Sequence, residues 1–262
     1  MLHTLRSLWV WFAVALLIVL WLPLLTAIRV TDRSPVRYRT GRWFRNLGVI
    51  MCRANPFWKI HLSGHTRVTD PRKPYVVISN HQSLADIPIL SHLPWEMKWV
   101  AKKVLFRLPF VGWMMRLAGD IPVDRADPHS GGTMLLTAMR YLEGKCSVMF
   151  FPEGTRSPDS RVHRFADGAF HIAIKAQVPL LPVAIEGSYR CLPKRSWRFG
   201  EPSSVHVTVL PEVPTKGMTV DDVGRLKTTV RRMIIEEIAR ARHTTVDAVD
   251  GLSTVSPSAV SS

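Results

Sequence analysis

A histidine and a carboxylate stand five positions apart in the segment N-H-Q-S-L-A-D, residues 80–86. Residues 75–79 before it are apolar and β-branched, as in a buried strand, and residues 84–93 after it favour a helix. His81 is therefore expected at a strand-to-helix turn. A neutral imidazole can accept a proton at neutral pH, while a nearby carboxylate fixes its tautomer and stabilises the imidazolium. His81 and Asp86 thus predict a general base, although a local helix cap or a core histidine also fits the spacing.

A second segment whose residues could take part in chemistry reads F-P-E-G-T-R-S at residues 151–157. It follows another apolar run. Gly154 lets a ligand approach the backbone, and the Thr155 hydroxyl with exposed N–H groups can bind oxygen anions. Arg156 can hold a phosphate through two parallel hydrogen bonds. A plain turn with a surface ion pair between Glu153 and Arg156 is the simpler reading. We predict that Glu153, Gly154, Thr155 and Arg156 bind substrate.

Two further cations follow apolar runs. Lys102 comes after residues 98–101, and Arg125 ends the stretch G-D-I-P-V-D-R at 119–125. Both are predicted to bind substrate, with solvated surface for the lysine and an ion pair with Asp124 for the arginine as the alternatives.

Other chemistries lack their motifs in this chain. The sequence contains no H-E-x-x-H motif or paired cysteine spacing, so no metal is expected. It has no G-x-S-x-G nucleophile elbow, which weighs against a lipase or esterase, and no nucleotide-binding glycine motif. Its three cysteines, Cys52, Cys146 and Cys191, are few and unpaired in spacing, which fits a reducing compartment.

Charge and an apolar N-terminus predict the location. The chain has 35 Lys and Arg against 20 Asp and Glu, a net charge of +15 that favours nucleic acid, anionic lipid or a phosphorylated ligand. Residues 8–28 carry no charge and are long enough to cross a bilayer, whereas a cleaved signal peptide usually has a shorter apolar run. Residues 29–45 then contain six arginines and one acid. This bias predicts a domain on the cytoplasmic face of the inner membrane, against its anionic leaflet.

Residues 40–53 form a second predicted helix, amphipathic and basic. Two geometries are open, because residues 8–28 either cross the bilayer or pair with this helix and dip into one leaflet, with Pro23 bending the chain. The sequence divides into membrane-associating helices at 1–58, a catalytic domain at 59–243 and a disordered tail at 244–262, whose composition is rich in serine and threonine.

The middle of the chain alternates short apolar runs with helical segments, which predicts a single α/β domain. Its central sheet is expected to be largely parallel, possibly mixed, and flanked by helices. The predicted strands are 75–79, 98–101, 121–123, 147–151, 181–186 and 205–209, and the predicted helices are 84–93, 110–117, 131–143, 168–175 and 220–240. Ligands bind beyond the carboxyl ends of such strands, where the three segments described above are placed.

Taken together, the segments resemble the glycerolipid acyltransferase family. The resemblance rests on four blocks in the family's order: N-H-x-x-x-x-D at 80–86, glycine to arginine at 119–125, F-P-E-G-T-R-S at 151–157 and V-P-L-L-P-V at 178–183. It implies an enzyme that moves an acyl chain from acyl-CoA or acyl carrier protein to the sn-2 hydroxyl of lysophosphatidate, giving phosphatidate, without a cofactor. His81 would be the base and Asp86 its orienting group, and the acceptor phosphate would lie against residues 154–156, Lys102 and Arg125.

The chain departs from the family pattern at one place. Residues 165–168 read F-A-D-G where the family commonly has F-K-x-G, so Ala166 replaces a lysine. Arg164 or Lys175 could supply the missing charge, or the acceptor could be another lysolipid, such as a lyso-aminolipid. A noncatalytic basic protein of the membrane surface is a third reading. Nucleic-acid binding is not expected, because the basic residues cluster beside the apolar segment and no binding motif accompanies them.

Overall fold

The computed structural model describes residues 2–124, 126–194 and 196–252. Within these residues seven strands form one sheet in the order β1-β7-β6-β2-β5-β3-β4. The strands are β1 Trp58–Ser63, β2 Val76–Ser79, β3 Met97–Lys102, β4 Ile121–Val123, β5 Ser147–Phe150, β6 Leu180–Glu186 and β7 Ser203–Val209. Neighbouring strands are parallel except β6 and β7. The predicted α/β fold with a largely parallel, mixed sheet is confirmed.

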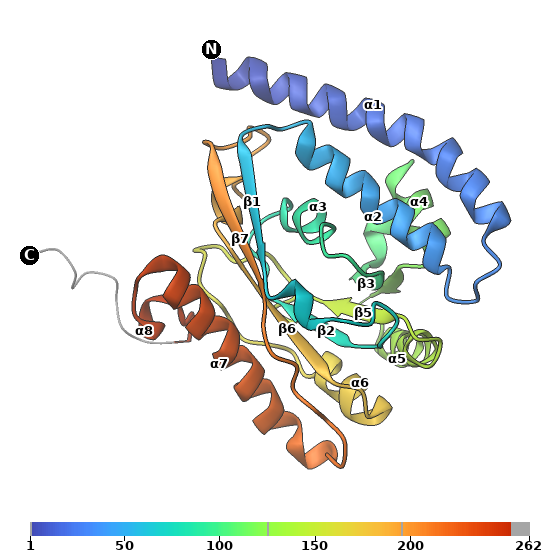
Figure 1. Ribbon diagram of the computed structural model, residues 1–262, viewed down its shortest axis with the longest axis vertical. Coiled ribbons are helices and arrows are strands. Elements are labelled where there is room, and N and C mark those ends of the chain that lie inside the picture. The colour runs from blue at the N-terminus through green and yellow to red at the C-terminus, as the bar shows by residue number, and fades with distance from the viewer. Residues whose placement is uncertain (1, 125, 195, 253–262) are drawn as a thin grey trace, which may run out of the picture.

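Helices cover both faces of the sheet (Figure 1). The helices are α1 Leu2–Thr31, α2 Tyr38–Arg53, α3 Asp86–Leu90, α4 Val111–Ala118, α5 Pro128–Glu143, α6 Gly168–Ala176, α7 Val223–Arg242 and α8 Val246–Val249, with short 3-10 turns η1 His65–Arg67, η2 Lys103–Arg107, η3 Ser188–Arg190 and η4 Val220–Asp222. Helices α5, α6 and α7 lie on one face, and α1 to α4 lie on the other. The result is a layered domain with the sheet in its middle.

The central strands are buried on both sides. On β2, Val76 and Ile78 pack with Phe170 of α6 on one face, while Val77 packs with Ile89 of α3 on the other, and all five side chains are fully buried. A strand buried on both faces needs apolar residues at every position, which explains the continuous run at 75–79. Strand β7 lies nearer the edge and alternates buried and exposed residues instead.

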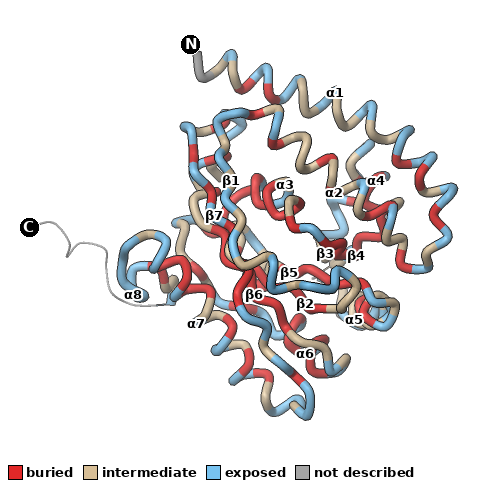
Figure 2. Tube along the Cα trace, in the orientation of Figure 1, coloured by how far each residue is buried: buried red, intermediate tan, exposed pale blue. Residues whose placement is uncertain are grey.

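The N-terminal helices pack on each other and on the domain. Helix α1 lies along α2 (Figure 1), and the two share an apolar cluster with α4 that contains Leu25, Leu47 and Met114. In the described part of the chain, α1 is the one helix long and apolar enough to cross a membrane. Most of its outer surface is exposed (Figure 2), including large apolar side chains. These are Leu5, Leu8, Trp9, Trp11, Phe12, Leu16, Val19, Leu20, Leu24 and Val30.

Two sequence predictions are corrected by the structure. The helix predicted at 84–93 is only the short α3, because residues 82–85 form a turn held by the Asp86 side chain. Disorder from residue 244 is wrong for residues 244–252, which contain α8, the fully buried Val249 and a parallel bridge between Val162 and Asp250. These contacts are long-range, so composition alone does not show them. Residues 253–262 lie outside the described part of the chain.

Candidate active site

His81 follows β2 at the carboxyl edge of the sheet, and Asp86 begins α3. The His81 Nδ1 atom lies 2.7 Å from Asp86 Oδ2, and the histidine side chain is 14% exposed. Since a carboxylate oxygen accepts, Nδ1 carries the proton, and Nε2 is left as the basic nitrogen. The pair has the geometry that a general base requires.

Asp86 is itself fixed by the backbone. Its Oδ2 atom also accepts hydrogen bonds from the N–H groups of Gln82 at 2.7 Å and Ser83 at 2.9 Å, and the residue is fully buried. One residue before His81, the side-chain amide of Asn80 exchanges two hydrogen bonds of 2.9 Å with the backbone of Ile185 on β6. These contacts explain why an asparagine, a histidine and an aspartate occur at this spacing.

The F-P-E-G-T-R-S segment leaves β5 and meets the histidine from the neighbouring strand. The Phe151 ring stacks on the His81 ring with centroids 4.1 Å apart, and the Ser157 N–H donates to the His81 carbonyl at 2.7 Å. Glu153 accepts from the backbone N–H groups of His81 at 2.8 Å and His163 at 3.0 Å. Burial raises the pKa of Glu153, while these two hydrogen bonds oppose the rise. Glu153 therefore positions the loop and does not line the cavity, which differs from its predicted contact with substrate.

A cavity of about 410 Å³ opens beside His81. Four of the predicted substrate-binding residues line it with the histidine, namely Lys102, Gly154, Thr155 and Arg156. They come from the ends of β3 and β5, which explains how positions far apart in sequence meet. Arg125 lies outside the described residues. The site can thus place a hydroxyl beside a base and an anion beside two cations.

A third cation lines the cavity and was not predicted as a substrate-binding residue. Lys194 follows β6 and η3, and its Nζ atom donates to the Arg156 carbonyl at 2.8 Å. Ala166 forms part of the cavity wall, whereas Arg164 and Lys175, the two predicted substitutes for its missing lysine, do not line it. No motif marks Lys194, because only the fold brings residue 194 to the 151–157 turn.

Asp167, the carboxylate that accompanies Ala166 in the F-A-D-G segment, points away from the cavity. Asp167 makes a 2.6 Å ion pair with Lys227 on α7, and the hydrogen bond from that lysine holds the pKa of Asp167 below its ordinary value. It therefore adds no negative charge to the cavity.

The rest of the cavity is apolar. Its wall includes Leu84, Ile87, Trp99, Val100, Leu105, Val123, Met134, Phe150 and Ala169. Such a wall suits a hydrocarbon chain, so one cavity combines a polar end at the histidine with an apolar remainder.

The cysteines take no part in this site. Cys52, Cys146 and Cys191 are buried free thiols, and burial raises the pKa of Cys146 and Cys191 to about 12. A thiol that stays protonated is a poor nucleophile. Among the described residues no group of three or more histidine, cysteine or acidic side chains is placed to hold a metal ion.

An oriented base lies beside a cationic and apolar cavity at the carboxyl ends of parallel strands, and this geometry suits the activation of a hydroxyl group on an anionic, lipid-like molecule. Known proteins are similar to this chain in sequence and fold. The profile of the Acyltransferase family matches residues 59–186. A chloroplast 1-acyl-sn-glycerol-3-phosphate acyltransferase of Arabidopsis thaliana is 37% identical over 166 residues, 63% of this chain and 46% of that protein. The beta form of the human enzyme of that name is 32% identical over 199 residues, 73% of this chain and 71% of that protein.

The fold comparison agrees. The crystal structure of the 1-acyl-sn-glycerophosphate acyltransferase PlsC from Thermotoga maritima matches with a TM-score of 0.78 and 26% identity, over 93% of this chain and 97% of that one. The chain belongs to the acyltransferase family, which confirms the family resemblance of the four blocks. It spans about half the length of the plant relatives, 46% of the Arabidopsis protein and 41% of a Brassica napus protein.

Proposed function

We propose that this protein is a 1-acyl-sn-glycerol-3-phosphate O-acyltransferase, which transfers an acyl chain from a thioester to the sn-2 hydroxyl of lysophosphatidate and forms phosphatidate. The observation that carries the proposal is the His81–Asp86 pair, at 2.7 Å, opening on a cavity with cations at one end and apolar walls beyond. The relatives carry this activity in their names.

The mechanism follows from the position of the base. His81 Nε2 takes the proton of the acceptor hydroxyl as its oxygen attacks the thioester carbonyl, and Asp86 stabilises the imidazolium that forms. The tetrahedral intermediate then collapses, the carbon–sulfur bond breaks, and the imidazolium returns the proton to the leaving thiolate. Neither an acyl-enzyme nor a cofactor is needed, because the acyl group passes directly between the two substrates.

The acceptor is held through its phosphate. Arg156, Lys102 and Lys194 line the same cavity, and several converging cations bind a phosphate dianion well at a wet interface. Lys194 supplies the positive charge that Ala166 lacks, which favours lysophosphatidate. The small Ala166 wall is the one observation in favour of a bulkier headgroup, such as that of a lyso-aminolipid. The donor is acyl-CoA or acyl carrier protein.

The protein acts at the membrane surface. Helix α1 keeps contacts with the domain along its length, since Arg6 bonds to the Phe199 carbonyl, Trp11 bonds to the Trp197 carbonyl and Leu25 packs on α2. These contacts favour a helix lying in one leaflet, because a helix along the bilayer normal would have to leave them. The arginines at 29–45 favour the anionic cytoplasmic leaflet.

The first experiment measures transfer by the purified protein in mixed micelles. Each donor is offered with lysophosphatidate or a lyso-aminolipid, and wild type is compared with His81→Ala and with His171→Ala, an exposed histidine on α6. We expect lysophosphatidate to be preferred and His81→Ala to lower kcat by about 10²–10⁴-fold, the usual value of general base catalysis. Wild-type turnover in His81→Ala would refute the base, and preference for the lyso-aminolipid would refute the acceptor.

A further inference from the structure

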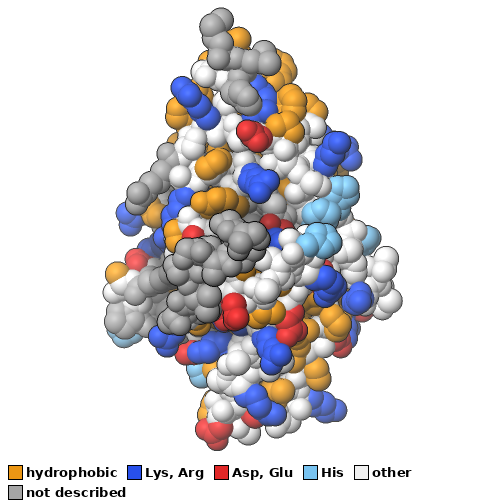
Figure 3. Space-filling model, turned by 90° about the vertical axis from the view of Figure 1, so that its left-hand side faces the viewer, with side chains coloured by type: hydrophobic (Ala, Val, Ile, Leu, Met, Phe, Trp, Pro, Cys, Tyr) orange, Lys and Arg blue, Asp and Glu red, His pale blue; other side chains and the backbone are white. Residues whose placement is uncertain are grey.

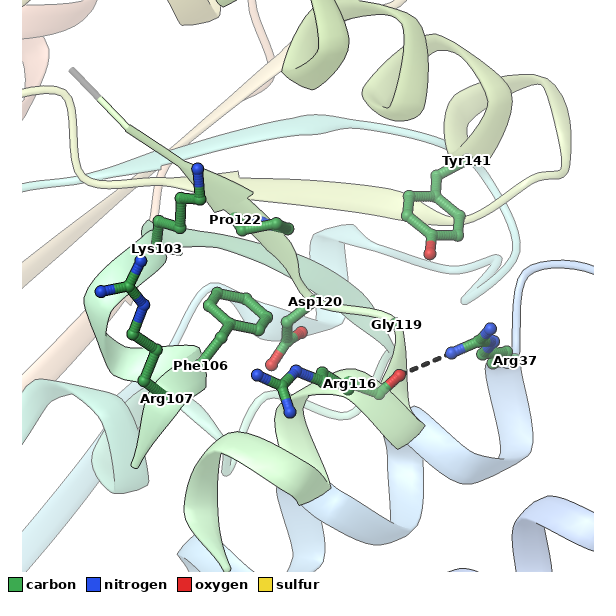
Figure 4. Close-up of a pocket in the computed structure, with 9 residues that line it drawn as sticks. All are labelled: Arg37, Lys103, Phe106, Arg107, Arg116, Gly119, Asp120, Pro122 and Tyr141. Atoms are coloured by element: carbon green, nitrogen blue, oxygen red, sulfur yellow. Dashed lines mark hydrogen bonds between the residues drawn. The ribbon is translucent and has the colours of Figure 1, made fainter. Parts of the chain in front are cut away.

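A second cavity, of about 390 Å³, lies on the same side of the molecule as the N-terminal helices but apart from the active site. It is formed by the residue before α2 and by η2, α4, β4 and α5 (Figure 4). Its lining residues are Arg37, Lys103, Phe106, Arg107, Arg116, Gly119, Asp120, Pro122 and Tyr141.

The two cavities have no lining residue in common, although neighbouring residues of the chain line one or the other. At the end of β3, Lys102 lines the active-site cavity and the next residue, Lys103, lines the second one. On β4 the same alternation places Val123 at the active site and Pro122 at the second cavity. The second cavity therefore lies behind the active site and is not part of the proposed acceptor phosphate site.

Its lining is strongly cationic. Four lining residues are basic and one is acidic, and the acid, Asp120, is already paired with the buried Arg45 and with the Trp99 N–H. Arg107 and Arg116 are exposed and have no carboxylate partner among the described residues. Lys103 makes only an exposed 3.8 Å contact with Asp124, which is a weak interaction. The guanidinium groups of Arg107 and Arg116 are thus left without a carboxylate counter-ion from the described residues.

Two features of the wall suit an oxygen anion. In Figure 4 the Tyr141 hydroxyl points toward Gly119 and Arg37 at one end of the cavity, and it has no hydrogen-bond partner in the described chain. Burial raises the pKa of Tyr141, so the hydroxyl remains a donor. Gly119 has a φ of +82°, and a Cβ atom there would lie 2.7 Å from the Tyr141 oxygen. The glycine keeps this part of the cavity open.

The cavity borders an apolar surface. The exposed rings of Phe110, just before α4, and Trp113, on α4, have centroids 5.3 Å apart, and Arg116 follows one turn later. The inner side of α4 packs on α1 and α2 through Met114. Aromatic rings next to arginine at the end of an apolar face are typical of the level where lipid headgroups lie.

We propose that this second cavity binds the phosphate of an anionic phospholipid of the surrounding membrane. Arg107 and Arg116 would hold two phosphate oxygens and Tyr141 a third, while Phe110 and Trp113 contact the acyl chains near the glycerol. The proposal rests on the membrane attachment argued above and not on the acyl-transfer chemistry.

The test counts bound lipids by native mass spectrometry of the full chain in a neutral detergent. Phosphatidate is added to wild type, to Arg107→Gln/Arg116→Gln, and to Arg156→Gln, which weakens the acceptor site alone. Arg232→Gln/Arg240→Gln, two exposed arginines on α7, is the charge-matched control. We expect two phosphatidate molecules on wild type and on the control, and one on each of the other variants.

The variants distinguish binding in the second cavity from binding in the active site. The choice of ligand distinguishes a phospholipid from a soluble phosphate ester. Arg107→Gln/Arg116→Gln should weaken retention at one site by about tenfold or more, since charge-assisted hydrogen bonds to phosphate are lost. Equal retention in this variant and the control, or equal retention of phosphatidylcholine, would overturn the proposal. Binding of glycerol 3-phosphate to the same arginines as tightly as phosphatidate would assign the cavity to a soluble ester and overturn its lipid part. Failure of Arg156→Gln alone would count only against the proposed acceptor site.

Discussion

At the residue scale, Asp86 has two functions, because one oxygen both orients His81 and accepts two backbone N–H groups. We predict that Asp86→Asn lowers kcat by about 10²–10⁴-fold with a small change in the KM for the acceptor, since an amide cannot stabilise the imidazolium as a carboxylate does. Steady-state kinetics in mixed micelles measure this. Asp221→Asn, at an exposed acid on η4, is the control. A mutant with wild-type kcat would show that the histidine needs no orienting charge.

Lys194 is the residue on which the acceptor assignment depends most. We predict that Lys194→Met raises the KM for lysophosphatidate by about tenfold, the value of one lost charge-assisted contact, while kcat changes less. Lys194→Arg should restore most of the affinity, because it keeps the charge. The KM for lysophosphatidylcholine should rise less, because its phosphodiester carries one negative charge where lysophosphatidate carries two. No constant should change in the exposed-site control Lys216→Met. An equal rise for both lysolipids would mean that Lys194 only supports the loop through the Arg156 carbonyl.

At the scale of elements, the C-terminal helices hold the loop that follows the 151–157 segment. Arg231 of α7 donates to the Val162 carbonyl at 2.6 Å and to the His163 carbonyl at 3.0 Å, and it pairs with Asp250 after α8. His163 donates its own N–H to Glu153, which in turn holds the His81 backbone. A chain of contacts therefore runs from α8 to the base.

The Arg231–Asp250 pair in this series of contacts predicts a pH-dependent contribution to stability. The hydrogen bond from Arg231 holds the pKa of Asp250 below its ordinary value of 3.8. The stabilisation is therefore fully present above about pH 3.8 and is lost as the pH falls through the lowered value. We predict that Asp250→Asn lowers the unfolding temperature at pH 7 and that the difference from wild type shrinks below pH 3.8. Thermal unfolding at several pH values in one detergent measures it, and a constant difference would exclude the ionised pair as the cause.

The elements also show what local sequence can and cannot predict. The continuous apolar run of β2 and the motif turns after β2 and β5 are local features, and the structure has them where predicted. Strand β1, W-K-I-H-L-S, is absent from the predicted strands although its alternation of apolar and polar residues is typical of a half-buried strand. Among the described strands its only partner is β7, 145 residues later in the chain, so local sequence does not show the pairing. The α8 helix and the place of Lys194 in the cavity were missed for the same reason, because distant contacts decide them.

At the scale of the molecule, the net charge of +15 is not one patch. Lysine and arginine side chains are spread over the face shown in Figure 3. Some cations are instead fully buried where the N-terminal helices meet the sheet. Arg45 of α2 pairs with Asp120 and lies 3.9 Å from Glu96, and Lys98 of β3 lies 2.8 Å from Glu96. Helix α2 lies close to Glu96 at Gly41, where a Cβ atom would overlap the Glu96 carboxylate.

This buried network joins α2 to the sheet through charged side chains. We predict that Arg45→Met lowers the free energy of unfolding by about 3–5 kcal/mol, because Asp120 then keeps a buried charge without its cationic partner, while Glu96 retains only Lys98. Arg39→Met, at an exposed position of the same helix, should change it by less than about 0.5 kcal/mol. Denaturant unfolding in one detergent compares the variants.

The double variant Arg45→Met/Asp120→Asn distinguishes the cause. If the loss comes from uncompensated charge, removing the facing carboxylate should recover part of it, so the two changes together cost less than their sum. If the loss comes only from packing of α2 on β3, the two costs should add. Recovery would mean that α2 and the strand leading to Lys102 are joined through charge pairing, so that the packing of the N-terminal helices and the wall of the active site depend on one buried ionic network.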